Sequence, residues 1–189
     1  MSTKYKATKD DSAYFITITT VHWVDVFTRL SQRKLIVNAL NYCVREKGLE
    51  IYAYCLMSNH LHMICRAVDN KKLSDILRDF KKFTSKNIIK NIIEKPESRR
   101  EWMLDIFSKA CDHLKRNKTY KVWQNGYHAE ILITHRFAYQ KLNYIHNNPV
   151  KDKIVEKPVE YLFSSARNYA NLEGLVEVVT LPHQLITYS

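Results

Sequence analysis

Glycine and proline are scarce in this chain, which has only 3 and 4 of them among 189 residues. Such a composition excludes collagen-like and linker-like sequences, and it leaves no glycine-rich loop of the kind that cradles phosphates. Long apolar runs are also missing, because none approaches the ~18 residues that a membrane-spanning helix needs. The segment Met1–Asp11 is polar and charged rather than a signal peptide. We therefore expect a cytoplasmic protein that makes no membrane contact.

Paired cysteine motifs are missing as well. The chain has 4 cysteines, and no two of them have a C-x-x-C spacing; they are Cys43, Cys55, Cys65 and Cys111. Most of them lie within apolar segments, where a thiol packs as a small hydrophobic group. The sequence thus predicts reduced, mostly buried thiols rather than disulfides or a zinc site.

Acidic side chains are too few to balance the basic ones. The chain has 30 lysines and arginines against 19 acidic residues, for a net charge of +11 and a pI near 9.4. Between residues 71 and 121 there are 15 basic and 7 acidic side chains, so much of the excess falls in the middle of the chain. This distribution favours a contact surface for a polyanion such as nucleic acid, although a basic and merely soluble surface would look the same.

The apolar patterns of the first half predict three strands and two helices. Residues that alternate between apolar and polar, or are β-branched, indicate strands at Tyr14–Val21, Leu49–Leu56 and His60–Ala67. The last two strands should form a hairpin. Helical spacing follows Ser31 and Ser74, which we expect to cap the two helices.

The second half is less regular. A basic insertion is expected at about 94–121, where Pro96 ends one helix and Trp102–Leu114 could form another. Strand character returns at Val122–Thr134, and a helix should follow until the Asn-Asn-Pro run at residues 147–149 ends it. A C-terminal extension from about residue 150 includes a possible late strand at 175–181.

The expected order of elements is strand, helix, strand, strand, helix, strand, helix. Without the insertion this is the order of a ferredoxin-like α+β sandwich, in which an antiparallel β-sheet has helices packed on one face. The first and third strands should lie in the centre of the sheet. A chain of 189 residues with 46% hydrophobic residues is large enough for one core, so we expect a single domain over residues 1–189.

A regular series of basic residues follows the second predicted helix. Arg78, Lys82, Lys86 and Lys90 recur at every fourth position, on the side opposite the apolar residues, among which Phe83 is expected to face inward. This basic stripe could bind a DNA backbone, and it could equally be a solvated helix surface.

Two histidines begin the third predicted strand. His60 and His62 are two residues apart, so both imidazoles should project from the same face while Leu61 points to the opposite one. This is a suitable geometry for two metal ligands. The same pair could also be ordinary hydrogen-bonded histidines.

The last predicted helix has a tyrosine and an asparagine on one face. Tyr144 and Asn148 are four residues apart, and in a sandwich of this order their face could meet the sheet near the histidines. Asn148 could then add an oxygen ligand beside a free Tyr144 hydroxyl. Alternatively, Tyr144 packs its ring on the core and Asn148 caps the helix end.

Three motifs at these positions identify a family. The sequences MSNHLHMI at 57–64, VWQNGY at 122–127 and YIHNNPV at 144–150 together resemble the tyrosine transposases of the HUH superfamily, and most of all the REP-associated branch, which is named after repetitive extragenic palindromes. The resemblance covers roughly residues 14–169. Ser58 departs from it, since relatives commonly carry proline there, as does the long insertion.

This resemblance implies a nuclease in which His60 and His62, assisted by Asn148, bind Mg²⁺ or Mn²⁺ and Tyr144 is the nucleophile. Related enzymes cut single-stranded DNA beside hairpins or palindromic repeats in the bacterial nucleoid, become linked to the 5′ phosphate and release a 3′ hydroxyl. They act as monomers or homodimers.

The residues themselves agree with this chemistry, because covalent catalysis beside a divalent ion keeps the phosphoester energy for rejoining. His146, two positions along the helix from Tyr144, should point away and be structural. Of the other tyrosines, Tyr139 lies off the Tyr144 face and Tyr127 belongs to a strand. Two competing functions remain: a non-catalytic single-stranded nucleic-acid-binding module, and a phosphoesterase that uses water as its nucleophile.

Overall fold

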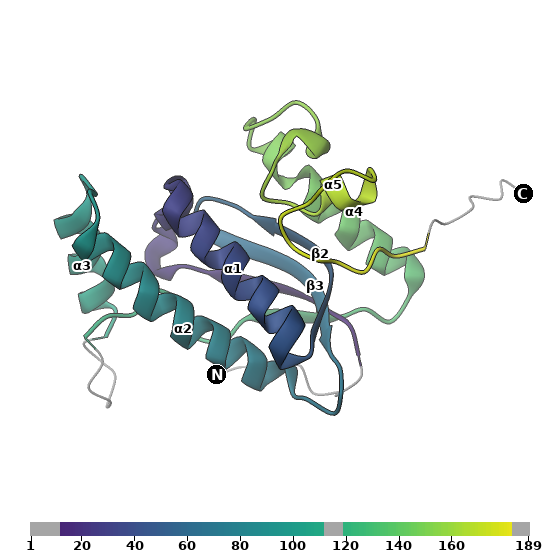
Figure 1. Cartoon of the computed structure of the whole chain (residues 1–189), viewed down its shortest axis with the longest axis horizontal. Coiled ribbons are helices and arrows are strands. Elements are labelled where there is room, and N and C mark those ends of the chain that lie inside the picture. Colours follow the sequence, from purple (N-terminus) through teal and green to yellow (C-terminus); the bar gives the residue numbers. More distant parts are fainter. Residues whose placement is uncertain (1–11, 112–118, 183–189) are drawn as a thin grey trace, which may run out of the picture.

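A four-stranded antiparallel sheet forms the centre of the protein. The computed structural model describes residues 12–111 and 119–182. The strands are β1 (Tyr14–Thr19), β2 (Leu49–Leu56), β3 (His60–Ala67) and β4 (His128–Ile131). Their order in the sheet is β2-β3-β1-β4, with every neighbouring pair antiparallel (Figure 1). The α+β class and the central position of the first and third strands are therefore confirmed.

Five α-helices surround this sheet in the described residues. They are α1 (Leu30–Lys47), α2 (Leu73–Glu94), α3 (Arg100–Lys109), α4 (His135–Lys151) and α5 (Ala166–Tyr169). Short 3₁₀ turns occupy Val21–Trp23, Val26–Thr28 and Pro158–Glu160. Buried apolar side chains from Tyr14 to Val176 join in one hydrophobic cluster.

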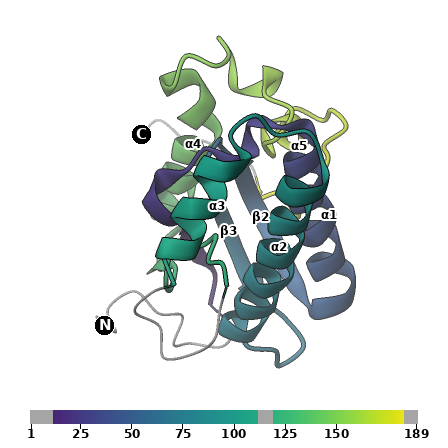
Figure 2. The same ribbon diagram turned by 90° about the vertical axis from the view of Figure 1, so that its left-hand side faces the viewer.

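The helices lie on both faces of the sheet, so the prediction that they pack on one face is wrong. Helices α1 and α2 run side by side over one face, and α4 lies on the other side of β2 and β3 (Figures 1 and 2). The last predicted helix has its own buried apolar side, which includes Leu142 and Ile145 and which needs a sheet face to pack against. Leu61 to Cys65 of β3 are all buried although successive side chains point to opposite faces, so this strand is covered on both sides.

Helix boundaries differ from those predicted at the N-terminal ends. The residues at the cap positions are Arg29 and Lys72 rather than Ser31 and Ser74, and neither makes a side-chain capping bond. Phe83 is 55% exposed instead of facing inward. At the C-terminal end of α1 the prediction holds, since Gly48 adopts φ of 70° and its N–H bonds to the Cys43 carbonyl.

The segment before β4 is much less extended than its sequence suggests. Only four residues of the predicted strand Val122–Thr134 form β4, although Trp123 makes an isolated bridge to Thr20. Gly126 has φ of 69°, a left-handed conformation that interrupts the extended backbone of a strand. The Lys81 amine donates to the carbonyls of Gln124 at 2.7 Å and Gly126 at 2.6 Å, which fixes this turn. The predicted helix at 102–114 is α3 in part, and residues 112–118 of the insertion lie outside the described residues.

Helix α4 continues through the asparagines and the proline that were predicted to end it. Pro149 lies inside the helix, whose last residue is Lys151. A proline this close to the end of a helix removes one N–H donor and disturbs only its end. The Asp152 N–H still donates to the Asn148 carbonyl at 3.1 Å, so the helical hydrogen bonding continues to the last residue. Thr134 starts the helix by accepting a hydrogen bond from the Phe137 N–H at 3.2 Å. Asn148 is consequently a helical residue and not a cap.

The C-terminal segment covers the outer edge of β2. The Leu56 N–H donates to the Phe163 carbonyl and the Val179 N–H donates to the Ile51 carbonyl, both at 2.9 Å. A single bridge joins Cys55 to Ser164. No strand forms at the predicted position 175–181, yet these contacts satisfy backbone groups that an edge strand would otherwise leave open.

The cysteines agree with a further prediction from the sequence. All four cysteines are free and buried, and burial raises the pKa of the Cys65 thiol to about 12. Among the helices of the described residues, none is both long and apolar enough to cross a bilayer.

Candidate active site

The two histidines of β3 project together from the sheet face that α4 covers. Their ring centroids are 4.5 Å apart. The Nδ1 atom of His60 lies 2.6 Å from the Asn59 side-chain oxygen, and the Nδ1 atom of His62 lies 2.8 Å from the Thr17 hydroxyl. With the proton on Nδ1 in each ring, both hydrogen bonds are made and both Nε2 atoms keep a lone pair for a metal ion.

Burial keeps this histidine pair uncharged at neutral pH. It lowers the pKa of His60, and with the nearby His60 and Lys141 side chains it lowers the pKa of His62 to about 3. A metal binds the deprotonated imidazole, so protons compete weakly for these two nitrogens near pH 7. The electrostatic setting therefore suits a pair of metal ligands.

Tyr144 of α4 lies directly beside the histidine pair. Its ring centroid is 5.2 Å from that of His62 and 5.9 Å from that of Phe15, which itself stacks on His62 at 5.5 Å. Although its ring is held by these contacts, Tyr144 is 39% exposed. The phenol is thus positioned by packing and remains accessible to a substrate.

Asn148 follows Tyr144 by one helical turn and is 8% exposed. Among hydrogen bonds within residues 12–111 and 119–182, none engages its side-chain amide, which leaves the amide oxygen available as a ligand. The same described residues contain no cluster of three His, Cys, Asp or Glu side chains that could hold a metal. The role of Asn148 as a third ligand beside the two histidines stays a prediction.

Two lysines near the tyrosine were missed by reasoning from the sequence. The Lys151 amine lies 5.1 Å from the Tyr144 ring centroid. The Lys141 amine lies 4.3 Å from the Phe15 ring and 2.9 Å from a Glu130 oxygen. Lys141 and Lys151 stand three residues before and seven after Tyr144, which places them on its helical face. This spacing could have predicted from the sequence that both lysines lie near Tyr144.

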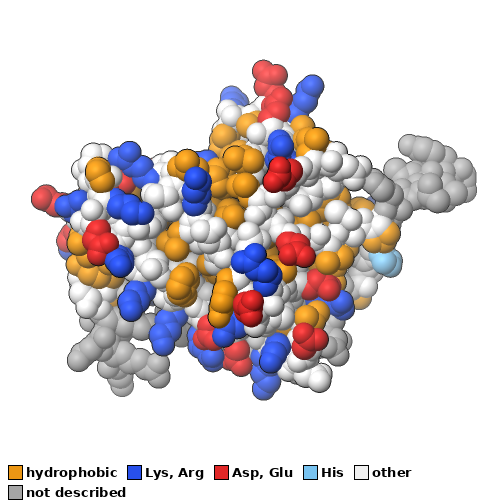
Figure 3. Space-filling view, in the orientation of Figure 1, with side chains coloured by type: hydrophobic (Ala, Val, Ile, Leu, Met, Phe, Trp, Pro, Cys, Tyr) orange, Lys and Arg blue, Asp and Glu red, His pale blue; other side chains and the backbone are white. Residues whose placement is uncertain are grey.

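The basic stripe lies apart from this site. Arg78, Lys82, Lys86 and Lys90 are exposed on α2, which packs on the opposite face of the sheet. Arg78 pairs with Asp75 at 2.6 Å and Asp79 at 3.1 Å. Figure 3 shows the face that carries α1 and α2, where basic and acidic side chains are interspersed. The structure does not bring the stripe together with the histidine pair, and its role in DNA binding stays a prediction.

Replacing both Lys82 and Lys86 with alanine tests the stripe. If each contacts one phosphate, the slope of log affinity for single-stranded DNA against log salt should become shallower by about 1.4. The measurement is fluorescence anisotropy over a range of salt concentrations. A matched variant removes two exposed charges of α1, Lys34 and Arg45, and should change the slope less. Equal changes in the two variants would refute the stripe as a contact surface.

His146 occupies the side of α4 away from Tyr144, as the helical spacing predicts. Its Nε2 atom lies 2.8 Å from the Ser165 hydroxyl, and its ring packs on Tyr169 at 5.1 Å. Burial lowers its pKa from 6.5 to about 4. The residue anchors α4 to the segment that covers β2.

This lowered pKa makes stability depend on pH. The unfolded chain takes up a proton near pH 6.5 and the folded protein only near pH 4, so stability is intact above pH 6.5 and falls below it. At pH 5 this group should reduce the free energy of unfolding by about 2 kcal/mol relative to pH 7.5. Urea titrations without metal measure the free energy of unfolding. Between pH 7.5 and pH 5, this free energy should fall by about 2 kcal/mol less in His146→Gln than in the unmodified protein. Identical losses in both proteins would contradict this account.

Nine chains of solved structures match this protein, and no curated protein matches it. The first is described as "Structure of the REP associates tyrosine transposase bound to a REP hairpin"; it aligns with a TM-score of 0.61 and 19% identity over 98% of this chain and 96% of that chain. The second, a candidate transposase from Deinococcus radiodurans R1, aligns with a TM-score of 0.43 and 17% identity over 78% of this chain and 95% of that chain. The first likeness confirms the predicted fold.

A family model gives the stronger assignment. The model described as "Transposase IS200 like" matches residues 9–112, which is more than half of the 189 residues. The matched span contains the histidine pair and ends before α4, so it includes neither Tyr144 nor Asn148. On the strength of this match, the chain belongs to the IS200-like transposase family.

Proposed function

We propose that this transposase cuts and rejoins single-stranded DNA by transferring a backbone phosphate to Tyr144. The observation that supports it most is the position of the Tyr144 ring, 5.2 Å from His62 and on the same sheet face as His60. A binding module needs neither a buried pair of neutral imidazoles nor an accessible phenol beside them.

The proposed ligands of a Mg²⁺ or Mn²⁺ ion are the Nε2 atoms of His60 and His62 and the amide oxygen of Asn148. This set fits a divalent cation because each donor atom has a lone pair to give and open positions remain for phosphate oxygens. When bound, the ion withdraws negative charge from the scissile phosphate and aligns it with the attacking oxygen. Thr17 and Asn59 hold the two rings in the orientation that this requires.

The reaction conserves one phosphoester bond. The Tyr144 oxygen loses its proton and attacks phosphorus, so that a bond forms to the phosphate at the 5′ end of the downstream strand while the bond from phosphorus to the 3′ oxygen of the upstream strand breaks. The departing 3′ oxygen takes up a proton. A second 3′ hydroxyl later attacks the phosphotyrosine, which releases Tyr144 and joins two strands. The Lys151 amine, 5.1 Å from the ring centroid, supplies positive charge where the phenol oxygen becomes negative.

The proposed substrate is single-stranded DNA that carries a hairpin or palindromic repeat. Support comes from the shared fold with a tyrosine transposase that was solved with a REP hairpin, and from the net charge of +11. We place this activity in the bacterial cytoplasm, at nucleoid DNA, and assign it to one domain over residues 1–189, as a monomer or homodimer. The basic insertion at 94–121 would add contacts to the DNA.

A covalent adduct is the test of this proposal. The protein is incubated with a hairpin oligonucleotide, labelled on the 3′ side of the expected break, and Mn²⁺. We expect a labelled band that survives denaturing electrophoresis and that peptide mapping assigns to Tyr144. Chelation with EDTA should prevent it. Tight binding of the oligonucleotide without any adduct or cleavage would favour the non-catalytic binding module instead.

A further inference from the structure

A pocket of about 400 Å³ opens between the turn after β1 and the segment before β4. Its walls include Trp23, Lys121, Gln124 and Asn125. The Trp23 ring is 60% exposed and lies edge-on to His60, with 6.1 Å between the ring centroids. The pocket is within the size range that holds small ligands, and one of its walls is a large aromatic ring next to a proposed metal ligand.

Trp23 has an unusual backbone that its neighbours fix in place. It adopts φ of 58°, a left-handed conformation that a bulky residue rarely takes up. The Asn59 amide donates to the Trp23 carbonyl at 3.3 Å, while its side-chain oxygen contacts His60. The Thr20 hydroxyl donates to the Val24 carbonyl at 2.8 Å across the same turn. One asparagine side chain therefore contacts both the Trp23 backbone and the His60 imidazole.

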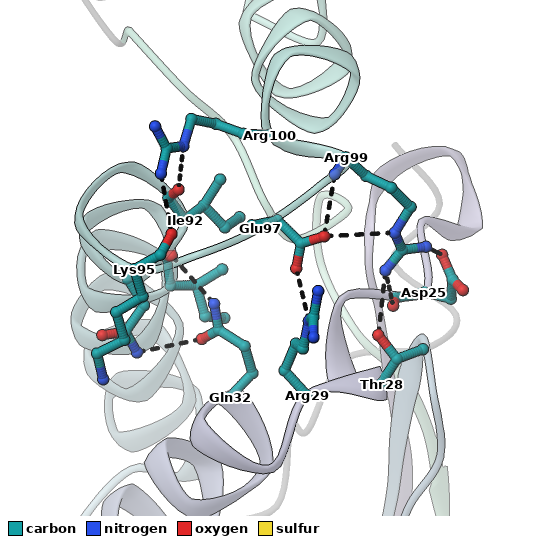
Figure 4. Close-up of polar contacts among 11 residues, drawn as sticks. Asp25, Thr28, Arg29, Gln32, Ile92, Lys95, Glu97, Arg99 and Arg100 are labelled. Carbon is teal, nitrogen blue, oxygen red and sulfur yellow. Dashed lines mark hydrogen bonds and ion pairs between the residues drawn. The ribbon is translucent and has the colours of Figure 1, made fainter.

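The far side of this loop is anchored to the start of α3. Arg99 pairs with the Asp25 carboxylate and donates to the Thr28 hydroxyl at 3.0 Å. Glu97 receives both Arg29 at 3.2 Å and the Arg99 N–H at 3.1 Å (Figure 4). These contacts fix residues 25–29, which directly follow the turn of Trp23, against the start of α3.

We propose that this pocket is a binding site for one unpaired base of the DNA strand, which stacks on Trp23 when the neighbouring backbone phosphate lies at the histidine pair. The inference rests on the proposed function, since it needs a single strand at His60. An exposed aromatic ring beside a basic surface is the usual platform for an unpaired base, because every base offers a flat π-face. The nearness of Trp23 to His60 makes it the base of a nucleotide close to the scissile phosphate.

The polar residues of the pocket can recognise the edge of this base. The Gln124 amide nitrogen donates to the Thr20 carbonyl at 3.0 Å, which leaves its side-chain oxygen as an acceptor. Asn125 is exposed and offers both a donor and an acceptor. Lys121 supplies a cation for a phosphate. The site would thus contribute sequence preference at one position of the single strand, separate from recognition of the hairpin.

The test combines protein variants with changes to single bases, in a background of Tyr144→Phe and EDTA so that only binding is measured. The probe is a hairpin oligonucleotide with unpaired flanks, in which one flanking nucleotide at a time is replaced by fluorescent 2-aminopurine or by an abasic site. We expect one position at which 2-aminopurine is quenched by the protein and not by Trp23→Ala. Trp23→Ala should weaken binding by at least about fivefold, which corresponds to the lower end of stacking energies of ~1–3 kcal/mol.

The abasic probe supplies the decisive comparison. At the stacked position, an abasic site should abolish the difference in affinity between Trp23→Ala and the protein that keeps Trp23. This is the result expected when the indole and the base interact directly. Trp23→Tyr should keep most of the affinity, and Tyr42→Ala, which removes an exposed aromatic ring of α1, should keep all of it. Full affinity in Trp23→Ala, or a loss that no abasic position removes, would overturn the base site. If the protein that keeps Tyr144 still forms the adduct with Mn²⁺ in that case, only the base site fails; if that protein neither binds the probe nor forms an adduct, the proposed function fails with it.

Discussion

Tyr144→Phe should form no covalent adduct with hairpin DNA, and its rate of strand cleavage should fall on the order of 10⁴-fold or more. The substitution removes the hydroxyl alone. The ring keeps its contacts with His62 and Phe15, both within 6 Å, so binding of the oligonucleotide should be unchanged. Denaturing electrophoresis reports the adduct, and anisotropy with EDTA present reports the binding.

Tyr139→Phe is the matched control, because Tyr139 lies five residues earlier on α4, off the Tyr144 face, and is partly buried in the core. It should form the adduct at the rate of the unmodified protein. Cleavage that persists in Tyr144→Phe without an adduct would refute the phosphotyrosine and favour water as the nucleophile. An adduct that moves to another tyrosine would show that the phenol beside His62 is not the reactive one.

His60→Ala and His62→Ala should each lower the rate of adduct formation by more than about 100-fold at a fixed low Mn²⁺ concentration. Loss of a partner that merely orients a metal-bound histidine costs about 10–100-fold, and loss of the ligand itself should cost more. Part of the rate should return as Mn²⁺ is raised. Calorimetric titration of Mn²⁺ into each variant measures the loss of metal affinity without reference to activity.

Thr17→Val tests the hydrogen bond that orients His62 separately from the His62 ligand itself. The substitution removes the hydrogen bond to the Nδ1 atom of His62 while leaving both imidazoles in place. Its rate should fall by an intermediate amount, about 10–100-fold. His135→Ala, an exposed histidine at the start of α4, should behave like the unmodified protein. Unchanged Mn²⁺ affinity in His60→Ala and His62→Ala would eliminate the histidine pair as the metal site.

The regular periodicities of the sequence predicted the sheet and the placement of the histidines. A two-residue repeat is enough to put His60 and His62 on one side of β3 and Leu61 on the other, and the structure has them so. Spacing along a helix likewise placed His146 away from Tyr144. These are local properties, which the backbone geometry of a strand or a helix determines by itself.

Features that depend on contacts between distant segments could not be predicted in this way. The side of the sheet on which α4 packs follows from tertiary packing, and so does the support of His62 by Thr17, which comes from the register between β1 and β3. Trp23 belongs to the same class, because its left-handed backbone is imposed by Asn59 and by contacts around it. In each case local preference is overridden by tertiary structure.

The covering of β2 has a bearing on how two copies of this protein can associate. Strand β2 is one border of the sheet, and residues 163–165 and 179 already accept or donate its outward-facing backbone bonds. A second copy could extend the sheet there only by displacing that segment together with the Ser165 contact to His146. The opposite border, β4, offers just four residues, too short a ladder to hold two proteins firmly by backbone pairing alone. For the described residues, we therefore expect a homodimer to be held mainly by side chains from helices or loops rather than by backbone pairing between sheet edges.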